Sequence, residues 1–99
     1  MANTSTRVLK VIKALRGKTF SGASVKELAD NIQESSVNVT RSLADLVEEG
    51  FVEKRSDGRY QLSVAMLQIA HSHQDETQRL QQRIEEYNRR ITTFELMKK

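Results

Sequence analysis

The sequence contains no cysteine and no proline, and aromatic residues make up only 5% of its 99 residues. The absence of cysteine excludes a disulfide framework, thiolate catalysis and cysteine-ligated zinc, and it fits a reducing cytosol. The N-terminus lacks the apolar run of a signal peptide, and no segment is long and apolar enough to span a membrane. We therefore predict a cytoplasmic protein that does not enter a membrane.

The sequence is also poor in apolar residues, which make up 37% of the chain. This fraction is at the low end for a compact globular domain. Part of the chain is therefore expected to be elongated or to complete its core in an oligomer. A chain of 99 residues has room for one small domain, alone or with an extension.

Signatures of catalysis are absent as well. The sequence has no glycine-rich phosphate loop, nucleophile elbow or histidine–glutamate zinc motif. Its two histidines, His71 and His73, would lie about 200° apart around the axis of a helix, so they cannot share a metal ion. The sequence predicts neither an enzyme nor a metal site, and it calls for no cofactor.

The formal net charge of +3 is small, but the charges are unevenly distributed. No acidic residue occurs in the first 26 positions, and the basic residues Arg7, Lys10, Lys13, Arg16 and Lys18 all lie within this stretch. Such a basic edge suits a polyanionic partner, although a solvated helix face would give the same pattern.

The chain from about Ser5 predicts an amphipathic first helix that Ser5 or Thr6 caps and Gly17 ends. Its apolar stripe consists of Val8, Leu9, Ile12 and Leu15. Residues 1–4 carry nothing to pack and are predicted to form a disordered tail. A loop over residues 18–23 follows, and Phe20 is its only apolar anchor.

A second helix begins with a capping box, in which the side chains of Ser24 and Glu27 each accept a hydrogen bond from the other residue's backbone N–H. The predicted buried face of this helix contains Val25, Leu28, Ala29 and Ile32. A turn over residues 33–36 leads to a third helix, which Ser35 or Ser36 caps and Gly50 ends. The predicted core residues of the third helix are Val39, Leu43, Leu46 and Val47.

The exposed side of this third helix changes character along its length. Its first two turns carry no acid, whereas its last two turns carry Asp45, Glu48 and Glu49. Because phosphates repel the acidic end, the pattern predicts a recognition helix that enters a DNA groove with its N-terminal residues. The predicted DNA-binding residues are Ser35, Ser36, Val37, Asn38, Thr40 and Arg41. Asn38 and Arg41 are the best candidates for base contacts.

The segment from Phe51 to Leu62 predicts a β-hairpin. A two-residue turn would divide the apolar side chains between two faces, so we predict a three-residue loop, Ser56-Asp57-Gly58, with a left-handed Gly58. The pairs in this register are Val52 with Leu62 and Lys54 with Tyr60. The hairpin is expected to act as a wing that touches phosphate or the minor groove, although a charged tip that only aids solubility is the alternative. The predicted backbone contacts of the first helix, the following loop and the wing are Thr6, Arg7, Lys18, Lys54, Arg55 and Arg59.

Residues 63–99 contain neither glycine nor proline and predict one long helix. Its first turns are expected to dock on the helical core through Val64, Met66, Leu67 and Ala70. Farther along, apolar residues recur at spacings of four and three, as in a coiled coil. This predicted dimerisation stripe consists of Leu80, Ile84, Tyr87, Ile91 and Phe94. Because a lone helix with such a stripe is unstable in water, we predict a homodimer, with the orientation of the two helices left open.

The order helix, helix, helix, hairpin, helix is that of a winged helix-turn-helix. Over about residues 5–70, the sequence resembles the N-terminal DNA-binding domain of the IclR family of bacterial transcription regulators. The matching segments are RVLKVIKAL (7–15), VKELADNI (25–32), SSVNVTRSL (35–43), LVEEGFV (46–52) and GRYQL (58–62). The chain departs from the family at Asn38, where a threonine is common, and at Ser42, where a second leucine is common.

The pattern and the resemblance together predict a mainly α fold with a minor β component. We expect a winged helix-turn-helix of three helices plus a β-hairpin wing, followed by a long C-terminal coiled-coil helix. The predicted divisions are a tail over residues 1–4, the winged domain over 5–65 and the dimerising helix over 66–99.

The predicted function is sequence-specific binding of double-stranded DNA by a dimeric transcriptional regulator. The protein would be of bacterial or phage type, and nucleoid-associated when bound. Because the chain has a coil where the family continues into an effector domain, no small-molecule effector is expected. The alternative is a protein–protein adaptor, in which the winged domain is a scaffold and the heptad helix binds a different helix.

Overall fold

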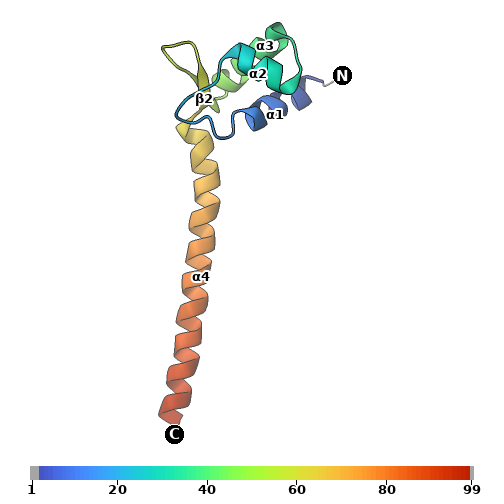
Figure 1. Cartoon of the computed structure of the whole chain (residues 1–99). Helices are drawn as coiled ribbons and strands as arrows, with labels where there is room; N and C mark the ends of the chain where they lie inside the picture. The colour runs from blue at the N-terminus through green and yellow to red at the C-terminus, as the bar shows by residue number, and fades with distance from the viewer. Residues whose placement is uncertain (1–2, 99) are drawn as a thin grey trace. The chain divides into compact units, whose positions relative to one another are not determined.

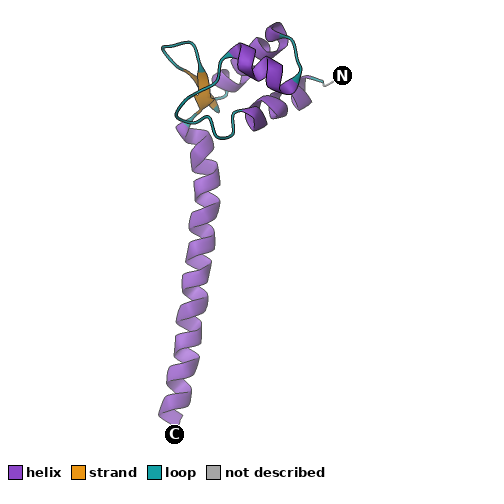
Figure 2. Ribbon diagram, viewed as in Figure 1, coloured by secondary structure: helices purple, strands orange, loops and turns teal. Residues whose placement is uncertain are grey.

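The computed structural model describes residues 3–98 and confirms a winged helix-turn-helix followed by a long helix (Figures 1 and 2). The elements in order are α1 (Thr4–Ala14), α2 (Val25–Ile32), α3 (Ser36–Glu48), β1 (Val52–Lys54), β2 (Tyr60–Leu62) and α4 (Val64–Lys98). The chain divides into two compact units, one up to Leu67 and one from Gln68 onward. In the first unit, α1, α2 and α3 pack against one another, and β1 packs against α3.

The first helix begins slightly earlier than the sequence predicts. Asn3 is its N-cap, and the Asn3 Oδ1 atom accepts a hydrogen bond of 2.8 Å from the backbone N–H of Thr6. The predicted caps, Ser5 and Thr6, therefore lie inside the helix. The predicted tail of residues 1–4 falls partly outside the described residues, since the structure does not describe residues 1 and 2.

One buried cluster joins the three helices and the hairpin. Its largest fully buried apolar side chains are Val11 of α1, Leu15 at the C-cap of α1, Leu28 of α2, Val39 and Leu43 of α3, and Val52 of β1. The prediction for α1 was wrong at Leu9, which is exposed, because Val11 rather than Leu9 lies between Val8 and Leu15 on the inner side.

Two further core predictions were wrong. Val47 is exposed, and the serine one position before Leu43, Ser42, is buried instead. Phe20 does not anchor its loop, because 94% of its surface is exposed. The loop is held through its backbone: Ala23 and Tyr60 exchange two N–H···O bonds of 2.8 Å, which adds a short third segment to the edge of the hairpin.

The turn between α2 and α3 depends on a residue in the left-handed region. Gln33 ends α2 with a φ of 57°, and the backbone N–H of Glu34 then bonds to the carbonyl of Ala29. The predicted capping box at Ser24 is present, with the Glu27 N–H bonded to the serine Oγ at 3.1 Å. Of the two predicted caps for α3, Ser35 is the one used, since its Oγ accepts from the N–H of Asn38.

The wing has the predicted register. Val52 pairs with Leu62 and Lys54 pairs with Tyr60. The loop residue Gly58 has a φ of 85°, as a three-residue loop requires.

A buried serine connects the hairpin to α4. The Ser63 Oγ donates to the carbonyl of Gly50 at 2.6 Å and accepts from the N–H of Met66 at 3.2 Å, so it caps α4. Within the first unit, the predicted docking of Val64 and Leu67 was wrong, because both are exposed and only Met66 is partly buried. No residue of α4 is fully buried within its own chain.

The two buried serines predict opposite effects of removing a hydroxyl. Ser42 is 1% exposed and its Oγ has no hydrogen-bond partner among residues 3–98, whereas Ser63 is 4% exposed and its Oγ has two. We expect Ser42→Ala to raise the free energy of unfolding by about 1 kcal/mol, because a buried unpaired hydroxyl is costly. Ser63→Ala should lower it by about 1–3 kcal/mol. Urea titrations measure both, and a stability loss in Ser42→Ala would contradict this account.

Candidate nucleic-acid interface

The first two turns of α3 present a surface that is free of acid and faces solvent. Ser36, Val37, Thr40 and Arg41 are exposed there, while Val39 and Leu43 on the opposite side are buried. Thr40 donates its hydroxyl to the carbonyl of Ser36 at 2.8 Å, which leaves the oxygen able to accept another hydrogen bond. Most of the predicted recognition residues thus lie at one exposed end of the helix, whereas Asn38 is partly buried.

Asn38 lies at the flank of this surface and is engaged by the turn before α3. Its Nδ2 atom donates to the Glu34 Oε2 at 3.4 Å, and the same carboxylate oxygen lies 3.7 Å from the Nε of Arg7. The Arg7 and Glu34 side chains are only 15% and 16% exposed. Arg7, predicted to meet phosphate, is therefore largely buried beside Glu34.

The arginines of the wing do not project freely from its tip. Arg55 donates to the carbonyl of Phe20 and lies 3.2 Å from the Asp57 carboxylate. Arg59 reaches the same loop and also forms an ion pair of 2.7 Å with Glu27. Lys54 remains exposed, with its Nζ 6.0 Å from the centre of the Tyr60 ring.

Among the described residues, Glu27 is the one whose pKa is clearly changed by its surroundings. Local desolvation raises the pKa of Glu27, but hydrogen bonds from Arg59 and Ser24, together with the charge of Arg59, lower it by more. Its pKa therefore lies below the ordinary value for glutamate. The capping box made Glu27 noticeable in the sequence, but nothing in the local pattern indicated Arg59 as its partner.

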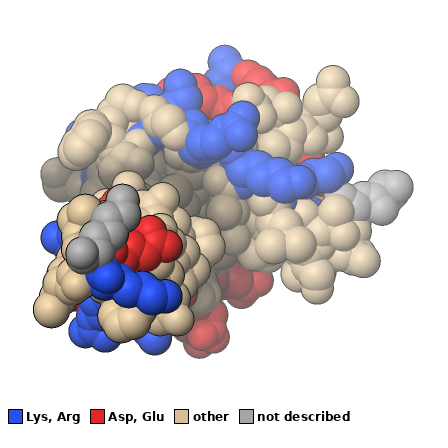
Figure 3. Space-filling model, turned by 90° about the horizontal axis from the view of Figure 1, so that it is seen from below, with Lys and Arg blue, Asp and Glu red and all other residues tan. Residues whose placement is uncertain are grey.

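A second basic surface lies along α1. A shallow depression between α1 and the end of α2 is lined by Lys10, Lys13, Arg16 and Lys18, together with Ala14, Asn31 and Ile32. In the described part of the chain, none of these four cations forms an ion pair. Figure 3 shows basic side chains gathered on one side of the N-terminal unit. Lys18, a predicted phosphate contact, belongs to this surface. Thr6, another predicted contact, is exposed near the start of α1.

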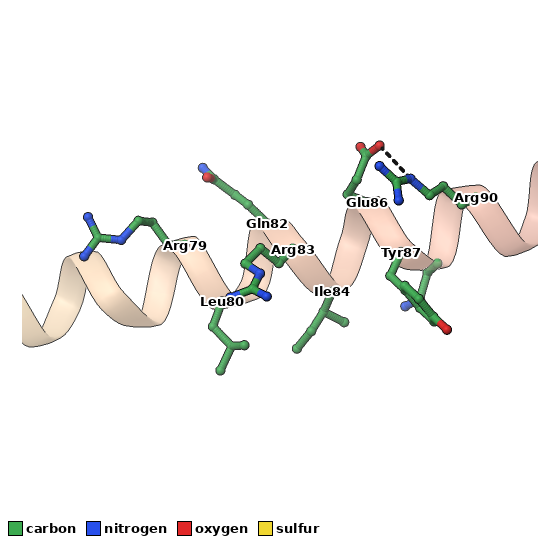
Figure 4. A pocket seen from close by; sticks show the side chains of 9 residues that line it. Arg79, Leu80, Gln82, Arg83, Ile84, Glu86, Tyr87 and Arg90 are labelled. Atoms are coloured by element: carbon green, nitrogen blue, oxygen red, sulfur yellow. Dashed lines mark ion pairs between the residues drawn. The ribbon is translucent and has the colours of Figure 1, made fainter.

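The predicted dimerisation stripe is present on α4. Leu80, Ile84 and Tyr87 lie on one side of the helix, while Gln82 and Glu86 lie on the opposite side (Figure 4). All five residues of the stripe, which also includes Ile91 and Phe94, are exposed in the single chain. Ion pairs from Glu86 to Arg89 and Arg90 lie away from the middle of the stripe.

Other kinds of site find little support in residues 3–98. No group of three or more histidine, aspartate or glutamate side chains there could hold a metal ion. Among the described helices, none is both long and apolar enough to cross a membrane. His71 is paired with Asp75 on the exposed surface of α4, with 3.3 Å between the Nδ1 and Oδ2 atoms.

Comparison with known proteins agrees with this geometry. The sequence model of the IclR helix-turn-helix domain matches residues 5–56, which are 52 of the 99 residues. The match covers α1, α2, α3 and β1 and ends within the loop of the hairpin. No curated protein sequence matches the chain.

The Glu27 contacts predict a specific acid sensitivity. Because the pKa of Glu27 is lowered in the folded chain, its contribution to stability is present above the unfolded value of about 4.3 and is lost as the pH falls through the lower folded value. Thermal unfolding between about pH 6 and 3 should therefore show a smaller loss of stability in Glu27→Gln than in wild type. Asp30→Asn controls for the loss of one negative charge on the same helix. Parallel curves for wild type and Glu27→Gln would contradict the assignment.

Proposed function

The chain belongs to the IclR helix-turn-helix domain family, and on this premise we propose that it is a dimeric regulator that binds double-stranded DNA sequence-specifically. The family points to a DNA-binding regulator rather than to an enzyme. The observation that carries the finer proposal is the exposed, acid-free N-terminal end of α3, which includes Arg41 and has the buried cluster behind it.

In this proposal the end of α3 reads base edges in the major groove. Arg41 is exposed and forms no ion pair with any other described residue, so its guanidinium is available for a bidentate contact with guanine. Val37 is 61% exposed and can meet a thymine methyl group. Ser36 and Thr40 can bond to bases or phosphates, and Asn38 contacts DNA from the flank where Glu34 holds it.

Phosphate contacts then come from exposed groups around this helix end. Thr6, Lys18 and Lys54 are exposed and are the simplest candidates. The hydroxyl oxygen of Ser35 already accepts the backbone N–H of Asn38, so a contact from Ser35 to phosphate would come from its hydroxyl hydrogen.

Dimerisation through α4 would present two such surfaces together. The stripe on α4 is exposed, and isoleucines at successive equivalent positions, Ile84 and Ile91, favour a two-stranded coil. A symmetric dimer reads an inverted repeat whose half-sites lie about 34 Å apart, or a multiple of that distance.

A loss of Arg41 should weaken binding and blur its specificity. We expect Arg41→Ala to cost about 1–3 kcal/mol of binding free energy and to relax the preference at one base pair. Arg79→Ala, which removes an equal charge from the exposed surface of α4, is the matched control. Fluorescence anisotropy with the operator and single-base variants measures both quantities. Equal affinities for wild type and Arg41→Ala on every duplex would favour the adaptor function instead.

Charges placed in the stripe should separate the two copies. Ile84→Asp with Ile91→Asp should convert a dimer into a monomer, because two buried carboxylates would face their counterparts across the coil. Gln82→Asp with Thr93→Asp places the same charges on exposed positions outside the stripe and should leave the dimer intact. Sedimentation equilibrium distinguishes the states, and an unchanged mass in the Ile84/Ile91 variant would refute this interface.

A further inference from the structure

The two arginines of the wing bind three successive carbonyl groups of the loop between α1 and α2. Arg55 donates from Nη1 to the carbonyl of Phe20 at 2.5 Å. Arg59 donates from Nε to the carbonyl of Ser21 and from Nη2 to that of Gly22, both at 3.1 Å. Hydrogen bonds from a charged donor are roughly twice as strong as neutral ones.

The same contact extends to the start of α2. The Nη2 of Arg59 lies 2.7 Å from the Glu27 Oε1, so this guanidinium uses three of its five N–H donors within the chain. The backbone pair of Ala23 and Tyr60 lies directly beside it. We call this set of contacts, from Arg55 and Arg59 to residues 20–22 and to Glu27, the wing–loop clasp.

The clasp is closely packed as well as hydrogen-bonded. Gly22 has a φ of 68° and is buried beneath the two arginine side chains. A Cβ atom added at Gly22 would lie 3.1 Å from the Arg55 Cδ and 3.1 Å from the Arg59 Cβ. The arginine stems therefore lie against the loop backbone, and their position is defined by packing.

We propose that Arg55 and Arg59 are positioning residues, which fix the wing to the α1–α2 loop before DNA arrives, and that they are not phosphate contacts. This inference rests on the proposed DNA-binding function. It replaces the expectation that both arginines grip the DNA backbone.

Two physical arguments favour positioning. Three of the five N–H donors of Arg59 are already occupied, and the Glu27 carboxylate beside them offsets the charge that a phosphate would otherwise meet. A hairpin that is ordered in advance also loses less conformational freedom on binding. The exposed parts of the wing, such as Lys54, are then held at a constant position relative to α3.

Binding measurements with two Arg59 variants distinguish positioning from direct contact. A phosphate contact needs mainly a positive charge, so Arg59→Lys would bind almost as wild type, and Arg59→Ala would reduce the slope of log K against log salt by about 0.9. Positioning needs the guanidinium fork. Under our proposal both variants lose affinity to a similar extent, about tenfold, and the slope of Arg59→Ala stays that of wild type.

The DNA affinity of Glu27→Gln is an independent test of the role of Arg59. The variant preserves the capping box but removes the ion pair with Arg59. If Arg59 were a phosphate contact restrained by Glu27, freeing it would tighten DNA binding beyond the effect of Asp30→Asn, an exposed acid on the same helix. Our proposal predicts that Glu27→Gln binds no more tightly than Asp30→Asn, and tighter binding would overturn it.

Amide hydrogen exchange tests the clasp without DNA. The N–H groups of Ala23 and Tyr60 should exchange about tenfold or more faster in Arg59→Ala and in Arg59→Lys, while those of Val39 and Leu43 stay protected in the core. Unchanged exchange at Ala23 and Tyr60 would overturn the clasp, whatever the DNA result. If wild type bound no duplex although the exchange result held, the proposed DNA function would fail and the clasp would stand only as a structural feature.

Discussion

The burial of Val39 and Leu43 in the cluster shared with α1 is the constraint on which the candidate interface depends. These two residues lie one helical turn apart, so together they fix the rotation of α3 about its own axis. With that side buried, Val37 and Arg41 must face solvent. The left-handed Gln33 ends α2, and the cap at Ser35 then begins α3, so that the acid-free residues occupy the first two turns of α3.

Ion pairs at the start of α2 and just after its end reduce the positive charge that is free to meet DNA. Glu34 pairs with Arg7 at the turn, and Glu27 pairs with Arg59 at the wing. Both pairs join segments that the sequence separates, so they hold parts of the unit together while neutralising an arginine. The remaining exposed cations of the N-terminal unit are Lys26, Arg41, Lys54 and the four that line the depression beside α1, and these should determine the electrostatic attraction of a polyanion to that unit.

The sequence was sufficient for the features that local periodicity and turn chemistry determine. The capping box at Ser24, the hairpin register and the long final helix follow from spacing alone, and the structure agrees with each. The predictions were wrong where contacts with distant segments of the chain determine whether a side chain is buried or paired. Phe20 was expected to be buried because it is apolar, but the loop is fixed through backbone and arginine contacts instead. Arg55 and Arg59 were expected to be free charges, because the loop carbonyls and the Glu27 carboxylate that they contact are more than thirty residues away in sequence. The function of the exposed stripe on α4 stays a prediction, since it depends on a second copy.

We propose that two recognition helices read one duplex, and selection of binding sites from random double-stranded DNA tests this claim. With the full chain, this account predicts enrichment of an inverted repeat whose half-site centres lie about 34 Å apart, or a multiple of that distance. The Arg41→Ala variant should enrich the same repeat with one position in each half-site relaxed. Selection that yields no common sequence, or a single half-site without its repeat, would contradict the claim.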